Sequence, residues 1–235
     1  MEDKVLKSKS WVANYFCSKV CEYQHYLEQV VSHCDTSLGR FSQKLLPVQN
    51  DLRLLTYAYG PLNNMVQTLK DSGSVFLPTA ISWGDIKKLR HGEFFYLSRN
   101  ASTHDGNPII NGWANGKYYV AHDIERFDGY GNFIKIQSPV KDVRTFTLEF
   151  SLDLYDLLAA RLKLLGDDHQ LIQPLIGPSE IEQIMGSQMI PEDVRNLFSG
   201  QIDEIKEKAG QIEVDPVAKA LEQIRTGVDY IRRVA

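Results

Sequence analysis

Apolar residues recur at intervals of three and four along four long segments, which is the spacing of helices that bury one face. Turn-forming residues at 35–39 and 71–74 end the first two segments, and Pro47 and Gly60-Pro61 interrupt the second, where we expect a bend or a break. The pattern predicts a mainly α-helical protein. The predicted helical segments are 11–31, 41–70, 82–105 and 143–165.

The third segment has clear start and stop signals. Ser82 is a predicted N-cap, with Asp85 in the first turn. Gly106, Asn107 and Pro108 follow the last apolar positions and stop the helix. We therefore expect one continuous helix between these two signals. The apolar face that supports it consists of Leu89, Phe94, Leu97 and Ala101.

The region 107–139 has a different character, with frequent glycines and several aromatic and β-branched residues. Residues 117–124 and 132–137 are strand candidates, and the glycine-rich segment 127–132 is suited to the loop between them. The sequence predicts a single β-hairpin inserted between the third and fourth helices.

Pro174, Gly177 and Pro178 mark a boundary after the fourth helix. We expect residues 1–166 to form a helical bundle and residues 170–235 a C-terminal helical appendage. Helices in the appendage are predicted to begin at Ser179, Pro191 and Pro216. The last one carries a short heptad seam that packs on the bundle or on a partner chain; the seam consists of Val217, Leu221, Ile224, Val228 and Ile231.

Three polar residues gather at the end of the third helix: Arg99, Asn100 and His104. Arginine offers a planar set of donors that fits a phosphate, and histidine exchanges protons near neutral pH. Asparagine supplies both a donor and an acceptor. Together these groups are able to cleave a phosphodiester without a metal, because the imidazole moves the proton and the guanidinium stabilises the developing charge.

The run Arg99-Asn100-Ala101-Ser102-Thr103-His104 resembles the signature of the HEPN superfamily, which is arginine, a polar residue, three variable residues and histidine. The resemblance implies a HEPN-like antiparallel helical bundle, here with a small β-hairpin insertion and the C-terminal helical appendage. It also implies a homodimer and a metal-independent endoribonuclease of a toxin–antitoxin or phage-defence system, with Arg99, Asn100 and His104 as catalytic residues.

The resemblance further implies that no cofactor is needed and that an antitoxin or nucleotidyltransferase acts as partner. Some family members carry a tyrosine two residues after the histidine, where a nucleotidyltransferase modifies them. Gly106 stands there in this chain, which argues against such a modification. The alternative is a non-catalytic helical module that binds a nucleotide, RNA or a protein.

RNA contacts are predicted around the motif and on the hairpin. Basic residues near the motif helix form a local patch, and residues of the hairpin are suited to stacking on bases or holding the backbone. The alternative is that the hairpin only covers one end of the bundle. The candidates are Lys87, Lys88, Arg90, His91, Tyr118, Tyr119, His122 and Arg126.

Helix geometry limits how Arg99 and His104 work together. Five residues of an ideal helix turn through about 500°, so the two side chains point about 140° apart and are separated by a rise of about 7.5 Å. Either the helix loosens near Ser102-Thr103, or one site combines residues from two chains. The family resemblance implies the second arrangement.

Composition restricts the remaining function classes. The net charge of −4 gives no global basic character for nucleic-acid binding. No apolar run is long enough for a membrane span. No apolar core with a cleavage site follows the polar N-terminal residues, so we expect no signal peptide. Three cysteines indicate a reducing cytoplasm. A metal site formed by Cys17, Cys21, His25 and Cys34 is an alternative to plain packing, and we expect packing and no metal.

Overall fold

The computed structural model describes residues 2–105, 109–167, 169–174, 177–198, 200–211 and 213–235. The chain is mainly helical, as the periodicity predicts. Its helices are α1 (Glu2–Ser42), α2 (Gln49–Phe76), α3 (Trp83–Lys87), α4 (Gly92–Asp105), α5 (Val143–Lys163), α6 (Pro178–Gly186), α7 (Glu192–Phe198), α8 (Ile202–Gln211) and α9 (Pro216–Val234). Its strands are β1 (Gly112–Ala114), β2 (Lys117–Tyr119), β3 (Ile124–Phe127), β4 (Phe133–Ile136), β5 (Gln173–Pro174) and β6 (Glu213–Val214).

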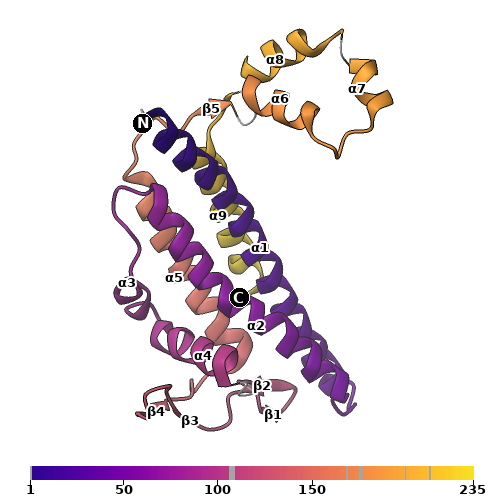
Figure 1. Ribbon diagram of the computed structural model, residues 1–235. Coiled ribbons are helices and arrows are strands. Elements are labelled where there is room, and N and C mark those ends of the chain that lie inside the picture. Colours follow the sequence, from indigo (N-terminus) through magenta and orange to yellow (C-terminus); the bar gives the residue numbers. More distant parts are fainter. Residues whose placement is uncertain (1, 106–108, 168, 175–176, 199, 212) are drawn as a thin grey trace.

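Four helices, α1, α2, α5 and α9, run lengthwise side by side and form the body of the molecule (Figure 1). Helix α4 and the first four strands lie at one end of this bundle, and α3 lies alongside α5, where Asp85 pairs with Arg161. The core below α4 is aromatic: Phe95 stacks on Phe150 with ring centroids 3.7 Å apart, and Phe146 packs against both Phe94 and Phe95. This packing fixes α4 on α5.

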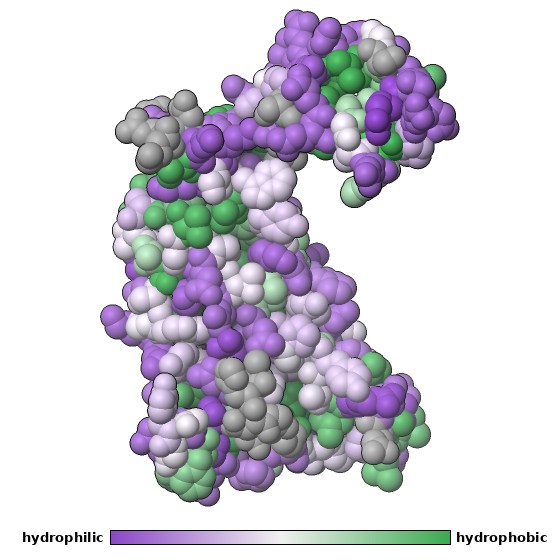
Figure 2. Space-filling view, viewed as in Figure 1, coloured by the Kyte–Doolittle hydropathy of each residue, from purple (hydrophilic) through white to green (hydrophobic). Residues whose placement is uncertain are grey.

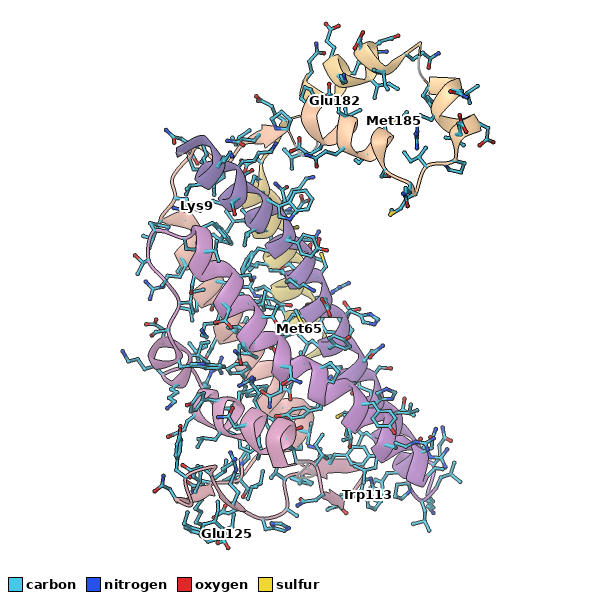
Figure 3. The ribbon with its side chains drawn as sticks, in the orientation of Figure 1. Lys9, Met65, Trp113, Glu125, Glu182 and Met185 are labelled. Carbon is cyan, nitrogen blue, oxygen red and sulfur yellow. The ribbon has the colours of Figure 1, made fainter. Side chains whose placement is uncertain are left out.

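The predicted turn at 35–39 is wrong, because α1 continues through it to Ser42. Ser37 is buried and receives a hydrogen bond of 2.9 Å from the indole N–H of Trp113, and Asp35 pairs with Arg144. Figure 3 shows Trp113 where the β1–β2 hairpin reaches α1. Contacts from distant segments therefore hold these turn-forming residues in a helix.

Helix α2 begins after Pro47 and continues through Pro61 as a single helix. It does not stop at 71–74, so the turn predicted there is also wrong. A side chain at Gly73 would lie 3.2 Å from the Leu77 side chain and 3.5 Å from the ring of Phe16, so glycine here permits close packing of α2 on α1. The glycine that resembles a helix stop is a packing residue.

The predicted third helix is divided in two. Ser82 caps α3 as expected, accepting a hydrogen bond from the Asp85 amide. However, His91 adopts a left-handed backbone conformation (φ 60°), which ends α3 before α4 starts at Gly92. A Cβ at position 92 would fall on the carbonyl oxygen of Ile86, so only glycine fits this junction.

The inserted region contains two hairpins instead of the one predicted. The first pairs β1 with β2 around Asn115-Gly116, whose positive φ values of 51° and 81° match a two-residue turn. The second pairs β3 with β4, with Ile124 opposite Ile136. The predicted strand 117–124 is therefore wrong, because it ends at Tyr119 and its last residue begins another hairpin.

The expected C-terminal appendage consists of two different parts. Helix α9 packs on α1 and α5 and contributes Val217, Ile224 and Ile231 to the core, so the heptad seam faces the bundle. Helices α6 to α8 form a lobe that projects from one end of the bundle (Figure 1). Helix α6 begins at Pro178, and Gly177 is its N-cap in place of the predicted Ser179.

Strands β5 and β6 join the lobe to the bundle. Figure 2 shows a hollow between the lobe and the bundle, with apolar residues of the lobe at the surface. Helices α7 and α8 contain no buried residue among those that the structure describes. Within the same described ranges, no helix has the length and apolar character needed to cross a membrane.

Candidate functional site

Arg99 and Asn100 are paired near the carboxyl end of α4. Nη1 of Arg99 donates a hydrogen bond of 2.9 Å to the side-chain oxygen of Asn100. Both residues are partly buried. Nε of Arg99 is fully buried and has no hydrogen-bond partner among the described residues. Asn100 thus holds the guanidinium from one side, and Nε is left without a partner in the part of the chain that the structure describes.

Asn63 of α2 forms hydrogen bonds to the turn of α4 that carries Arg99 and holds it in place. Asn63 is 2% exposed. With the amide oriented by its neighbours, it accepts hydrogen bonds from the Arg99 amide (3.1 Å) and the Ser98 hydroxyl (3.0 Å) and donates one to the Phe95 carbonyl (2.9 Å). The only signal of Asn63 in the sequence is that it is a polar residue within the apolar stripe of α2.

The backbone of His104 belongs to α4, which remains helical to Asp105. The side chain of His104 lies outside the described part of the structure. The backbone of α4 stays helical at Ser102-Thr103. The structure therefore does not have the loosened helix that would let one chain bring Arg99 and His104 together. On a regular helix the side chains of Arg99 and His104 leave the axis about 140° apart.

A polar cluster on α2 lies close to Arg99. It consists of Gln67, Lys70 and Asp71, and Lys70 forms an ion pair with Asp71. Burial raises the pKa of Asp71, but hydrogen bonds from Lys70 and Gln67 and the nearby charge of Arg99 outweigh it, so the pKa lies below its ordinary value. The side-chain oxygen of Gln67 is buried without a hydrogen-bond partner in the described ranges.

Lys87 and Lys88, both predicted to bind RNA, are exposed at the end of α3. Neither forms an ion pair with any residue that the structure describes. Nζ of Lys87 lies 4.0 Å from the centroid of the Tyr96 ring on α4. These two charges are therefore available to a polyanion.

Arg90 and His91 are engaged with α5. Arg90 pairs with Asp153 at 2.6 Å, and Nε2 of His91 lies 2.9 Å from a carboxylate oxygen of Glu149. The hydrogen bond from Arg90 lowers the pKa of Asp153. Both side chains therefore fasten the α3–α4 junction to α5, which differs from the free RNA-binding role expected for them.

The four residues of the inserted region that were predicted to contact RNA have different surroundings. Tyr118 is 2% exposed because β2 packs on α1 and α5, so its expected stacking on a base is wrong for this structure. Tyr119 is partly buried, and exposed His122 lies within 3.0 Å of the Asn111 amide. Arg126 lies on β3 and is partly buried. In the described part of the chain, no hydrogen bond or ion pair joins these four residues to Arg99 or Asn100.

A cavity of about 350 Å³ lies between α4 and β4. His91, Glu93 and Leu97 line it from the side of α4, and Lys135 and Ser138 line it from the second hairpin. It contains both polar and apolar groups. Neither Arg99 nor Asn100 is among the residues that line it.

The cysteines of α1 are spread over different environments. Cys17 is partly buried, Cys21 is exposed and Cys34 is buried. Burial raises the pKa of the Cys34 thiol to about 12. Across the described ranges, no group of three or more histidine, cysteine or acidic side chains is arranged to hold a metal ion.

A scan against models of protein families finds no match to this sequence, and searches among curated proteins and among solved structures find none either.

Proposed function

We propose that the protein is a metal-independent endoribonuclease of the HEPN type that acts through Arg99, Asn100 and His104. The observation that carries this proposal is the environment of Arg99, in which Asn100 holds one guanidinium nitrogen and buried Nε has no partner in the described structure. A buried donor without a partner calls for an explanation, and the pairing of an arginine with a phosphate is one that chemistry supplies. The scissile phosphate of RNA is such an acceptor.

In the proposed reaction His104 removes the proton of the ribose 2′-hydroxyl, or protonates the departing 5′ oxygen. The 2′ oxygen forms a bond to phosphorus as the bond to the 5′ oxygen breaks, which leaves a 2′,3′-cyclic phosphate and a 5′-hydroxyl. Arg99 stabilises the charge that develops on the phosphoryl oxygens. Asn100 keeps the guanidinium in position through its hydrogen bond.

We infer that the active form is a homodimer with a two-fold axis near α4. The helix remains regular between Arg99 and His104, and positions five residues apart on a regular helix face about 140° apart, which favours a site shared by two chains. A two-fold interface places each motif opposite its copy, so Arg99 of one subunit acts together with His104 of its partner. By the same resemblance, an antitoxin partner and a role in phage defence are part of this proposal.

A subunit-mixing experiment tests the proposed function. Arg99→Ala and His104→Ala proteins are each expected to be inactive on labelled RNA in the presence of EDTA. After the two are unfolded together and refolded, half of the dimers are mixed, and each mixed dimer has one intact composite site. The mixture should therefore recover roughly a quarter of wild-type activity.

Each variant refolded with itself is the matched control for this recovery. If wild type cuts RNA and the refolded mixture is as inactive as its components, the composite site is wrong. If wild type itself cuts no RNA under these conditions, the nuclease proposal is wrong.

A second candidate function is RNA or nucleotide binding without catalysis. It is favoured by one observation: the Arg99–Asn100 hydrogen bond and the donor of Arg99 that has no partner among the described residues both belong to residues other than His104. Binding that survives His104→Ala and is lost with Arg99→Ala, in a wild-type protein without nuclease activity, distinguishes this function from the first.

A further inference from the structure

Cations and aromatic rings alternate across the junction of α2, α3 and α4. Nζ of Lys70 on α2 lies 5.6 Å from the ring centroid of Trp83, and the centroid of Trp83 lies 4.9 Å from that of Tyr96 on α4. Nζ of Lys87 then lies 4.0 Å from the centroid of Tyr96. We call these four residues the Lys–aromatic row. Proteins that bind single-stranded nucleic acids combine positive charge with aromatic rings on which bases stack.

The two ends of the row differ in how firmly the lysine is held. Lys70 is largely buried, with 15% of its side chain exposed, and it is paired with Asp71. Lys87 is exposed and forms no ion pair among the described residues. Its ammonium group is therefore free to leave the Tyr96 ring and pair with a phosphate. The ring that this movement uncovers is partly exposed and is backed by Trp83.

The row is continuous with the candidate site. Tyr96 precedes Arg99 by three residues on α4, so the two side chains are neighbours one turn apart. Lys70, at one end of the row, pairs with Asp71, and the charge of Arg99 is among the causes that lower the pKa of the Asp71 carboxyl. A single RNA strand that stacks one base on Tyr96 would thus bring an adjacent phosphate toward Arg99.

The geometry points to the Lys–aromatic row as the site that selects single-stranded RNA. One base stacks on Tyr96 with Trp83 behind it, and Lys87 pairs with the backbone phosphate of that nucleotide. This inference rests on the proposed function in taking RNA as the ligand. A duplex is excluded from the row because its bases are already stacked on one another and do not present a free face.

The test is binding of a short fluorescein-labelled 2′-O-methyl RNA, which lacks the attacking hydroxyl and stays intact. Tyr96→Ala should weaken binding about ten-fold or more, whereas Tyr96→Phe should bind like wild type because it keeps the ring. Lys87→Met should weaken binding and reduce its salt dependence. A duplex of the same sequence should bind more weakly than the single strand.

Tyr15→Ala is the matched control, because Tyr15 on α1 also has a lysine near its ring, with Nζ of Lys19 5.9 Å from the centroid. It should bind like wild type. Tryptophan fluorescence adds a second readout: RNA should quench the wild-type signal, and Trp83→Phe should lose this quenching while Trp11 and Trp113 remain.

Equal binding by Tyr96→Ala and Tyr15→Ala, absence of Trp83 quenching, or preference for the duplex would overturn the inference. Wild type that fails to bind the RNA at all would overturn it as well. Tyr96-dependent binding by a protein that cuts no RNA supports the inference and contradicts the nuclease. RNA cleavage by a protein whose RNA binding does not depend on Tyr96 contradicts the inference and supports the nuclease.

Discussion

Replacing Arg99 or His104 by alanine is expected to lower the rate of RNA cleavage by a factor of about 100 or more, with EDTA present throughout. His104 provides general acid–base catalysis, which contributes about 10²- to 10⁴-fold in enzymes. Arg99 stabilises the charge of the transition state, and the loss of one such donor has an effect of similar size. The measurement is the initial rate of cleavage of a labelled single-stranded RNA.

Arg53→Ala and His25→Ala are the matched controls, because both residues are exposed and lie on α2 and α1, whereas the motif lies on α4. They should cleave at the wild-type rate. If the Arg99 and His104 variants cleave as fast as these controls, the residues have no catalytic role.

Gly92→Ala is expected to destabilise the protein by about 2 kcal/mol or more and to reduce cleavage as well. The added Cβ would fall on the carbonyl oxygen of Ile86, so the backbone between α3 and α4 must shift. That shift strains the hydrogen bond of 2.9 Å from the Gly92 amide to the Leu89 carbonyl, and it displaces the start of the helix that carries Arg99. Urea unfolding measures the change in the free energy of unfolding.

Gly39→Ala provides the comparison for this change. Gly39 lies in the last turns of α1, and a Cβ there meets nothing within 4 Å. Because alanine favours the helix, this variant should be equal to wild type or more stable by up to about 1 kcal/mol. Equal stability of Gly92→Ala and Gly39→Ala would show that the α3–α4 junction is not constrained by Gly92.

The sequence predicts the long helices well because their apolar residues repeat over many turns. It predicts their ends less well. Ser37 lies in a turn-like sequence, yet the indole of Trp113, far along the chain, bonds to it and buries it within α1. Gly73 resembles a stop signal but serves close packing. Such contacts are formed between segments that no local pattern connects.

The candidate site, too, is predicted from the sequence only in part, because some of its features depend on tertiary packing. The spacing of Arg99, Asn100 and His104 is visible in the sequence, and so is the turn signal of Asn115-Gly116 between β1 and β2. The support from Asn63 is not visible, because it depends on how α2 packs against α4. Whether a tyrosine such as Tyr118 faces solvent or the core likewise depends on tertiary packing.

The most direct test of the nuclease is the chemistry of its products in the presence of EDTA. The proposed attack by the 2′-hydroxyl predicts fragments with a 2′,3′-cyclic phosphate and a 5′-hydroxyl, identified by mass spectrometry. It also predicts that a substrate with 2′-deoxyribose at the cleavage position stays intact. Fragments with a 3′-hydroxyl and a 5′-phosphate, cleavage of the deoxy-substituted substrate, or loss of all cleavage on addition of EDTA would contradict the account.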